Sequence, residues 1–230
     1  MTGRPQAPAP ITGPGPSIFS VSILTAMHEN ILNPDQRHLA SHLLPGFNQF
    51  YLCGGTAIAL QIGHRKSIDF DLASAGDIHA RSLTNHILKS GLTIDETLVS
   101  TRDELTVIIN GVKLTFFSFP FSIRADQVWQ SARLKLPDLI HLGSMKAYAL
   151  GRRCQWKDYV DLYFLLKYHV SLSELIEKTG QIFKGAFNAR LFREQLCYFK
   201  DVDMTETVAY MNDPLDNEHI CRFLTQTALS

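Results

Sequence analysis

The sequence that decides the fold reads FYLCGGTAIAL at residues 50–60 and SIDFDL at residues 67–72. The first segment is typical of a short apolar strand that runs into a glycine pair and then into a helix. Adjacent glycines let the backbone turn tightly, so that a ligand can approach without meeting a Cβ atom. The amides at the start of the following helix favour an anion such as a phosphate. We therefore expect a phosphate-binding turn at Gly54, Gly55 and Thr56.

The second segment carries two carboxylates at alternate positions. Side chains at i and i+2 project from the same face of a strand, so Asp69 and Asp71 should point to one place. Hard divalent cations prefer oxygen ligands. We predict that the two aspartates hold Mg²⁺, with Mn²⁺ as the alternative ion. Nucleotidyl transfer needs a metal that binds the triphosphate and a turn that holds the far end of the same triphosphate. The two segments together would supply both.

Together the segments resemble the signature of DNA polymerase beta-type nucleotidyltransferases. The fuller string, GGTAIAL, GHR and DFDL within residues 54–72, is similar to the AbiEii-type nucleotidyltransferase toxins of bacterial type IV toxin–antitoxin and abortive-infection systems. A second block supports it, with KAYA at residues 146–149, Arg152, and KDYVDL at residues 157–162. The resemblance implies an NTP as donor, a tRNA 3′ end as acceptor, a cognate antitoxin encoded nearby, and a cytoplasmic location.

The resemblance also implies roles for basic residues. A lysine at the position of Lys146 contacts the nucleotide phosphates in such enzymes, although a lysine on an apolar helix stripe otherwise snorkels to solvent. Arg65 is expected to help Lys146 neutralise negative charge as pyrophosphate leaves. Ser67 is expected to bind the nucleotide. A solvated turn explains the basic stretch at residues 63–66 about equally well.

Two carboxylates lie on the helix expected at residues 156–167. We predict that Asp158 supports catalysis, by orienting the attacking hydroxyl or by acting as its base. Asp161 faces apolar neighbours, and a carboxylate there needs a partner. We therefore predict a structural role for Asp161, which either receives hydrogen bonds or pairs with Arg152 or Arg153.

The strand that follows the two aspartates departs from the wider superfamily. Many polymerase beta-type enzymes place a third catalytic carboxylate there, whereas residues 112–117 read VKLTFF, without an acid on either face. The third carboxylate is either missing or supplied from elsewhere in the chain. This argues against a full two-metal mechanism but is compatible with one magnesium ion held by Asp69, Asp71 and the substrate's phosphates. It also motivates an alternative, a catalytically weak or inactive nucleotide-binding module. A further alternative is transfer to a protein or to the hydroxyl of a small molecule. Another is an α+β scaffold without an active site, in which the glycines and aspartates are only turn and surface residues.

Composition and charge set limits on the class of protein. The chain has 230 residues with 22 Lys+Arg against 22 Asp+Glu, so no overall field favours nucleic acid and any RNA contact must come from a local patch. No apolar run is long enough to span a bilayer. The four scattered cysteines are typical of reduced, mostly packed residues in a cytosolic protein. Neither a Walker A loop nor a Rossmann glycine string surrounds the glycine pair.

We expect an α+β fold with a small mixed sheet. Residues 1–17 are a Pro-rich leader predicted to be disordered, residues 18–136 the nucleotidyltransferase core, and residues 137–230 a helical C-terminal lobe. His38 and His42 share a face at i, i+4, and a polar outer face is favoured over a metal pair because no third ligand is visible. An Asn-Gly turn predicts a hairpin of residues 105–109 and 112–117. Helices are expected at residues 34–44, 56–62, 77–89, 137–151, 156–167, from 171, at 188–199 and at 216–229.

Overall fold

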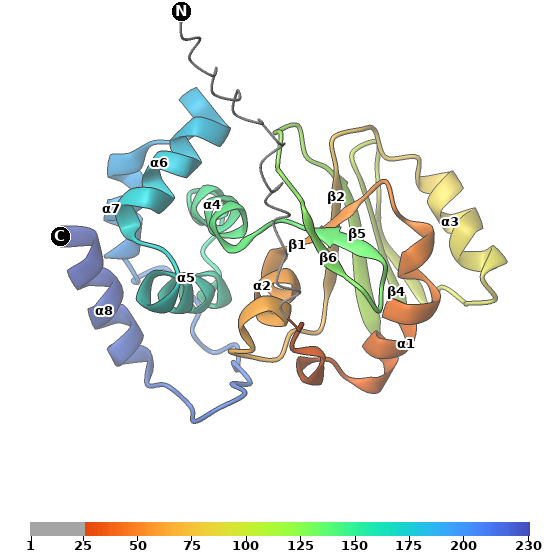
Figure 1. The fold of residues 1–230 in the computed structure, drawn as a ribbon, viewed down its shortest axis with the longest axis horizontal. Coiled ribbons are helices and arrows are strands. Elements are labelled where there is room, and N and C mark those ends of the chain that lie inside the picture. The colour runs from red at the N-terminus through yellow and green to blue at the C-terminus, as the bar shows by residue number, and fades with distance from the viewer. Residues whose placement is uncertain (1–25) are drawn as a thin grey trace, which may run out of the picture.

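The computed structural model describes residues 26–230, and the leader predicted at residues 1–17 lies outside them. The fold is α+β, as predicted (Figure 1). The strands are β1 (Tyr51–Cys53), β2 (Phe70–Ser74), β3 (Glu96–Ser100), β4 (Glu104–Ile109), β5 (Val112–Ser118), β6 (Gln127–Trp129) and β7 (Leu134–Leu136). The α-helices are α1 (Pro34–His42), α2 (Gly54–Ile62), α3 (Ala80–Lys89), α4 (Leu139–Leu150), α5 (Trp156–Tyr168), α6 (Leu172–Phe183), α7 (Ala189–Leu196) and α8 (Asn217–Leu229). Short 3₁₀ helices occupy Glu29–Ile31, Leu44–Gly46 and Lys184–Ala186.

The strands of the described residues form one mixed sheet in the order β3-β4-β5-β2-β1-β7-β6. β2 lies antiparallel to β1 and parallel to β5, with Asp71 opposite Thr115. The predicted hairpin of β4 and β5 is confirmed. Its turn residues Asn110 and Gly111 both have positive φ, 50° and 70°, which is the backbone that an Asn-Gly hairpin turn requires.

The two faces of the sheet have different tasks because side chains alternate along each strand. Phe70, Leu72, Leu114 and Phe116 are fully buried in the main core, together with apolar residues of α1 and α3. Asp71, Lys113, Thr115 and Phe117 belong to the opposite face, which borders a cleft. One face therefore stabilises the fold by packing in the core, and the polar side chains of the other face are accessible to a ligand in the cleft.

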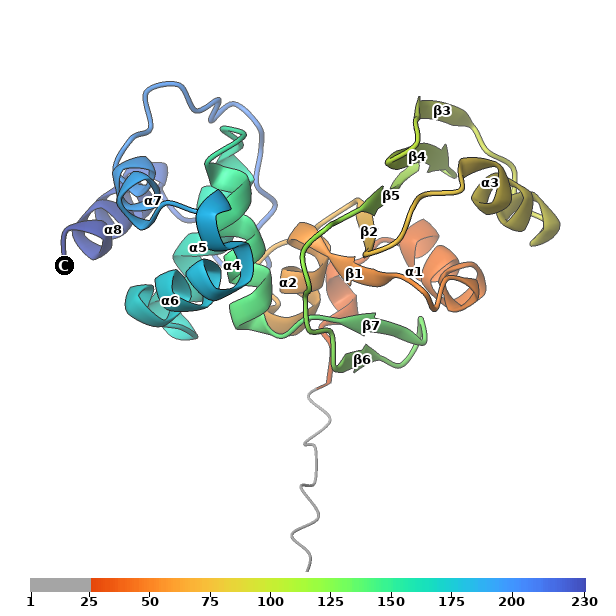
Figure 2. The same cartoon turned by 90° about the horizontal axis from the view of Figure 1, so that it is seen from above.

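A second core lies among α4, α5, α6, α7 and α8. In Figure 2 these helices stand beside the sheet, with α2 between the two parts. α4 contacts α2 as well as α5 and α6, so it joins the two cores. The division at residue 137 stays a prediction, because α4 packs against both sides.

Several element bounds differ from the prediction. β2 begins at Phe70, so Asp69 lies just before the strand, and α3 begins at Ala80 instead of residue 77. The β6–β7 hairpin was not predicted, since its strands have only three residues each. The exposed side chains of His38 and His42 confirm the predicted polar face of α1. All four cysteines are free, with Cys53 buried and Cys154 exposed.

Candidate active site

A cleft of about 630 Å³ lies between the sheet and α4. Three predicted site residues line it, namely Gly54, Asp71 and Lys146. The remaining lining comes from Cys53, Thr101, Asp103, Glu104, Lys113, Thr115, Phe117, Ser118, Phe119, Leu142, Met145, Tyr148, Ala149, Arg152 and Arg153. The cleft is thus large enough for a nucleotide, since ligand pockets typically measure roughly 300–1,000 Å³.

The glycine pair lets two charged side chains approach the start of α2. Gly54 has φ +69°, and a Cβ there would lie 2.2 Å from Oδ2 of Asp71. A Cβ on Gly55 would lie 2.2 Å from Nη2 of Arg65. No side chain caps the N-terminus of α2, so its first amides remain available to an anion. The turn therefore brings a carboxylate and the amides of a helix N-terminus to one end of the cleft.

Asp69 and Asp71 lie on the same side of the sheet, as the alternation predicted. Asp71 lines the cleft, whereas Asp69 is 38% exposed at its side chain and pairs with Lys113 (Nζ–Oδ2 3.0 Å). Burial raises the pKa of Asp71, and Lys146 partly offsets this. Two carboxylates suit Mg²⁺, which commonly takes few protein ligands. No group of three or more metal-ligating residues occurs within residues 26–230, so a bound ion would complete its shell with water and substrate oxygens.

Thr56 and Ser67 lie behind the cleft instead of lining it. The buried Thr56 hydroxyl bonds the Ser67 hydroxyl (Oγ1–Oγ 2.8 Å) and the main-chain oxygen of Asp69. The Ser67 main-chain oxygen accepts a bond from Gln36 (2.7 Å). These contacts fix the backbone that enters β2. In this structure the two residues position Asp69, and their side chains do not face the space for a nucleotide.

Lys146 lies at the centre of an ionic cluster, which we define as Arg65, Lys146, Arg153, Asp158 and Asp161, and of these only Arg153 is exposed. Its Nζ is 2.6 Å from Oδ1 of Asp158 and 2.8 Å from Oδ2 of Asp161. Burial would lower the pKa of Lys146, but the two aspartates outweigh it and raise the pKa. The lysine is therefore charged and held in place at the cleft wall, and it does not snorkel to solvent.

The predicted partners of Asp161 were wrong. Asp161 binds Arg65 through both oxygens (Nε–Oδ1 2.7 Å, Nη2–Oδ2 2.9 Å) and accepts from His64 (Nε2–Oδ1 2.8 Å). Burial alone would raise the pKa of Asp161, but Arg65 and Lys146 hold the pKa well below its usual value. The predicted structural role of Asp161 agrees with this geometry, while Arg152 and Arg153 make other contacts.

Arg65 is buried and does not line the cleft, in contrast to its predicted contact with the triphosphate. Residues 209–211 cover the loop after α2, because Arg65 pairs with Tyr210 in an isolated bridge and the Met211 amide donates to the His64 main-chain oxygen (3.1 Å). This segment is the loop that leads back toward α2 before α8 in Figure 1. Within the basic turn, His64 and Arg65 are thus buried and Arg65 is not directed at the cleft, whereas Lys66 is exposed.

Asp158 is held by Lys146 and by Arg153, whose Nε lies 2.8 Å from Oδ2. Burial would raise the pKa of Asp158, but these two cations outweigh it and lower the pKa. A carboxylate with a lowered pKa is a poor general base near neutral pH. The geometry favours a positioning role for Asp158, which aims Lys146 at the cleft, over the predicted role of base.

The third carboxylate is absent from β5, as predicted, and Lys113 stands beside Asp69. Asp103 and Glu104, at the turn into β4, also line the cleft. The sequence analysis missed both acids because they precede β5 instead of lying on it. Only the antiparallel pairing of β4 with β5 places Glu104 opposite Phe117.

Comparisons with known proteins agree with this fold. Residues 38–139 match the family model described as nucleotidyl transferase AbiEii toxin, type IV toxin–antitoxin system. Beyond these residues lies the second sequence block, with Lys146 and Asp158. An uncharacterized protein of Aquifex aeolicus strain VF5, aq_aa25, is 28% identical over 158 residues, which cover 67% of this chain and 75% of that protein.

Solved structures share the fold at low sequence identity. MenT4, the nucleotidyltransferase toxin Rv2826c of Mycobacterium tuberculosis H37Rv, is 14% identical with a TM-score of 0.54, over 84% of this chain and 80% of that one. JHP933 of Helicobacter pylori is 14% identical with a TM-score of 0.50, over 85% and 88%. The match of residues 38–139 to the AbiEii nucleotidyltransferase toxin family thus confirms both the resemblance predicted from the sequence and the enzyme class, a nucleotidyltransferase.

Proposed function

We propose that the protein is a magnesium-dependent toxin that transfers a nucleoside monophosphate from an NTP to the 3′ end of an RNA, with tRNA as the acceptor. The observation that carries this proposal is the convergence of Asp71, Gly54 and Lys146 on one cleft. Family membership of the matched segment supports the reaction class. The acceptor rests on the resemblance alone.

In the proposed reaction, the acceptor hydroxyl attacks the α-phosphorus, the bond from that phosphorus to the bridging oxygen of pyrophosphate breaks, and the hydroxyl proton passes to solvent water. Asp69 and Asp71 would hold Mg²⁺ or Mn²⁺, which supplies positive charge to the triphosphate when bound. The amides of Gly54 and Gly55 bind phosphate oxygens at the helix N-terminus. Lys146, aimed by Asp158 and Asp161, stabilises the charge that develops on the leaving pyrophosphate.

A second candidate is a nucleotide-binding module with little or no transfer. The observation that favours it is the pairing of Lys113 with Asp69, on a sheet face where β5 has no acid. This module would bind NTP with magnesium, yet release no pyrophosphate with any acceptor. Protein and small-molecule acceptors remain alternatives within the transferase reading.

A pyrophosphate-release assay separates the candidates. The purified protein is given each NTP, Mg²⁺ and a mixed RNA pool, beside Asp69→Asn and the matched control Asp213→Asn, an exposed aspartate. We expect release by the wild type and the control, and none by Asp69→Asn. Saturable NTP binding without release under any acceptor would establish the binding module instead.

Regulation and location follow from the same proposal. A cognate antitoxin encoded nearby is the proposed partner, in line with the type IV toxin–antitoxin description of the matched family. We propose that the protein acts in the cytoplasm, because the proposed reaction uses NTP and RNA. Within the described residues, the helices are too short or too polar to cross a membrane.

A further inference from the structure

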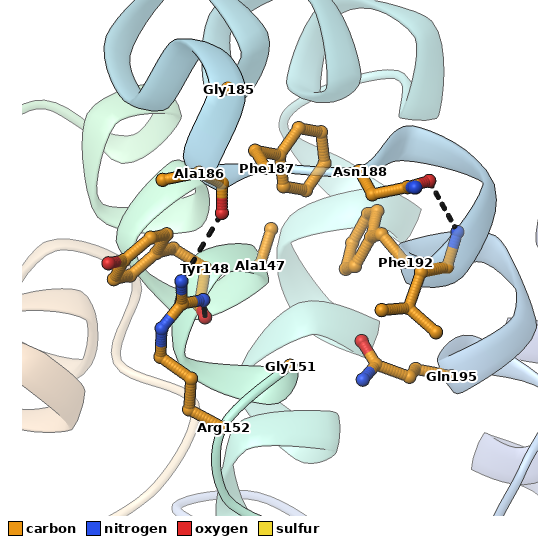
Figure 3. Close-up of a pocket in the computed structure, with 11 residues that line it drawn as sticks. Ala147, Tyr148, Gly151, Arg152, Gly185, Ala186, Phe187, Asn188, Phe192 and Gln195 are labelled. Carbon is orange, nitrogen blue, oxygen red and sulfur yellow. Dashed lines mark hydrogen bonds between the residues drawn. The ribbon is translucent and has the colours of Figure 1, made fainter.

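A second pocket, of about 280 Å³, lies in the helical part of the molecule (Figure 3). It is bounded by the end of α4, the 3₁₀ helix Lys184–Ala186 and α7. Ala147 and Phe192 give it an apolar floor, while Arg152, Asn188 and Gln195 place polar groups around it. Its size lies just below the roughly 300–1,000 Å³ of sites for drug-sized ligands, so it suits a single ring system.

The pocket adjoins the catalytic cleft, because Tyr148 and Arg152 line both. The Arg152 guanidinium lies over the Tyr148 ring, 3.5 Å from its centroid. It donates to the main-chain oxygens of Tyr148 (2.9 Å) and Ala186 (3.2 Å). Tyr148 in turn stacks on Phe183 with 4.2 Å between ring centroids. An exposed arginine is thus held in one orientation at the junction of the two cavities.

Charge distinguishes Arg152 from its neighbours. Lys146 and Arg153 are paired with buried aspartates. No carboxylate of the described residues lies within ion-pair distance of Arg152, whose side-chain bonds go to neutral carbonyls. A guanidinium whose charge is not neutralised by a carboxylate is suited to bind a phosphate diester, which it can contact through two N–H groups.

The amides at the pocket are equipped to bind the edge of a nucleobase. Asn188 accepts from the Leu191 amide through Oδ1 (3.0 Å), which leaves its NH₂ group to donate. The Gln195 side chain makes no hydrogen bond within the described part of the chain, so it offers both a donor and an acceptor. An apolar floor with donors and an acceptor at the rim matches a flat ring with a polar edge.

We propose that this pocket receives the base of the acceptor nucleotide that precedes the reacting 3′ end, while Arg152 contacts the phosphate between the two. This inference rests on the proposed function and assigns a binding site to the acceptor, whose 3′ end must be single-stranded for its base to enter the pocket. The larger cleft beside Asp71 and Gly54 has room for the NTP. The smaller pocket is therefore left to the acceptor.

The test uses three variants of the full chain that alter the pocket and leave the cleft carboxylates intact. Leu191→Glu adds a negative charge at the rim, Gln195→Ala removes the free amide, and Arg152→Ala removes the phosphate contact. Leu88→Glu and Arg81→Ala are matched controls on α3, far from the pocket (Figure 1). Leu191 and Leu88 have similar exposure, 47% and 51%, so both substitutions should leave the fold intact.

Two affinities are measured for each protein: that for NTP with Mg²⁺, and that for a labelled single-stranded RNA with a free 3′ hydroxyl. We expect each pocket variant to weaken RNA binding roughly tenfold, which corresponds to about 1.4 kcal/mol. NTP affinity should be unchanged in Leu191→Glu and Gln195→Ala, because these two residues line the pocket and not the cleft. The RNA affinity of Arg152→Ala should also depend less steeply on salt, because one phosphate contact is lost. The controls should match the wild type.

Each other outcome has a definite meaning. Pocket variants that bind and label RNA as well as the wild type would overturn the inference while the proposed function stands. Weakened NTP affinity in Leu191→Glu or Gln195→Ala would assign the pocket to the donor base, which also overturns the inference. A wild type that binds NTP but neither binds nor labels RNA would refute the RNA acceptor and this inference together.

Discussion

The Arg65 guanidinium binds both carboxylate oxygens of Asp161, with Nε–Oδ1 2.7 Å and Nη2–Oδ2 2.9 Å. This pair ties the loop after α2 to α5, which packs against α4, the helix that carries Lys146. Both side chains are nearly inaccessible to solvent. The relative placement of the two walls of the cleft depends on it.

Asp161→Asn is expected to destabilise the protein by about 3–5 kcal/mol at pH 7, because it leaves Arg65 and Lys146 buried without full compensation. The pKa of Asp161 is lower in the folded state than in the unfolded state. The ionised carboxylate therefore stabilises the wild type fully at pH values above the unfolded-state pKa. This stabilisation is lost as the pH falls through the folded-state pKa. The difference in free energy of unfolding should be the same at pH 7 and pH 5 and smaller at pH 3, below the unfolded-state pKa of about 4.

Urea unfolding of both proteins at these three pH values measures the effect. Asp213→Asn, at an exposed aspartate, should change the free energy of unfolding by less than about 0.5 kcal/mol. A difference between wild type and Asp161→Asn that persists undiminished at pH 3 would contradict the electrostatic account.

Gly54→Ala is expected to displace Asp71, since the added Cβ would lie 2.2 Å from its Oδ2. The positive φ at Gly54 adds strain of about 1–2 kcal/mol for a residue with a Cβ. Mn²⁺ affinity should fall, while the circular dichroism spectrum keeps its native shape. Gly76→Ala is the matched control, because a Cβ there meets nothing within 4 Å. Equal Mn²⁺ affinities in the two variants would show that Gly54 serves only the turn.

Lys113→Met is expected to raise the affinity for Mn²⁺ in the absence of NTP. Lys113 occupies one oxygen of Asp69, and a cation at the metal position must displace it. Such a partly exposed ion pair is worth about 0.2–1 kcal/mol, so the gain should be at most about fivefold. Lys135→Met, which removes the same charge at an exposed position on β7, should have no effect. Weaker Mn²⁺ binding in Lys113→Met would mean that the lysine organises the site instead of competing with the metal.

Asp158 and Lys146 should act as one unit. A hydrogen bond between charged groups contributes about 1.5–3 kcal/mol, so Asp158→Asn should lower kcat/KM for NTP roughly 10- to 150-fold. If Asp158 only aims Lys146, then Lys146→Met combined with Asp158→Asn should be no worse than Lys146→Met alone. Additive losses, together with loss of the acid limb of the kcat–pH profile in Asp158→Asn, would restore Asp158 as the base.

The local parts of the fold were predictable because their signals are short-range. The helices predicted from residues 34 and 171 both form, and each begins with a capping box, at Asn33 and Ser171. The Asn110-Gly111 turn closes its hairpin. The alternation of Asp69 and Asp71 correctly placed them on one face, since the period of a strand is a local property.

The errors concern contacts between distant parts of the chain. Arg65 has the sequence context of a basic surface turn, and it is buried because residues 209–211 fold over it. Nothing near Asp161 in sequence identifies Arg65 as its partner, and the nearby Arg153 binds Asp158 instead. Asp103 and Glu104 reach the cleft only through strand pairing. Tertiary packing determines the burial of Arg65, the partner of Asp161 and the position of the two acids at the cleft. A single sequence contains no direct signal for such packing.

The measurement that tests the central claim most directly is transfer of label from each α-labelled NTP to total cellular RNA with Mg²⁺, for the wild type beside Asp69→Asn. The account predicts label in a tRNA-sized band with the wild type and none with the variant. Equal labelling by Asp69→Asn would contradict the metal assignment. No labelling by a wild type that still binds NTP would contradict transfer to RNA.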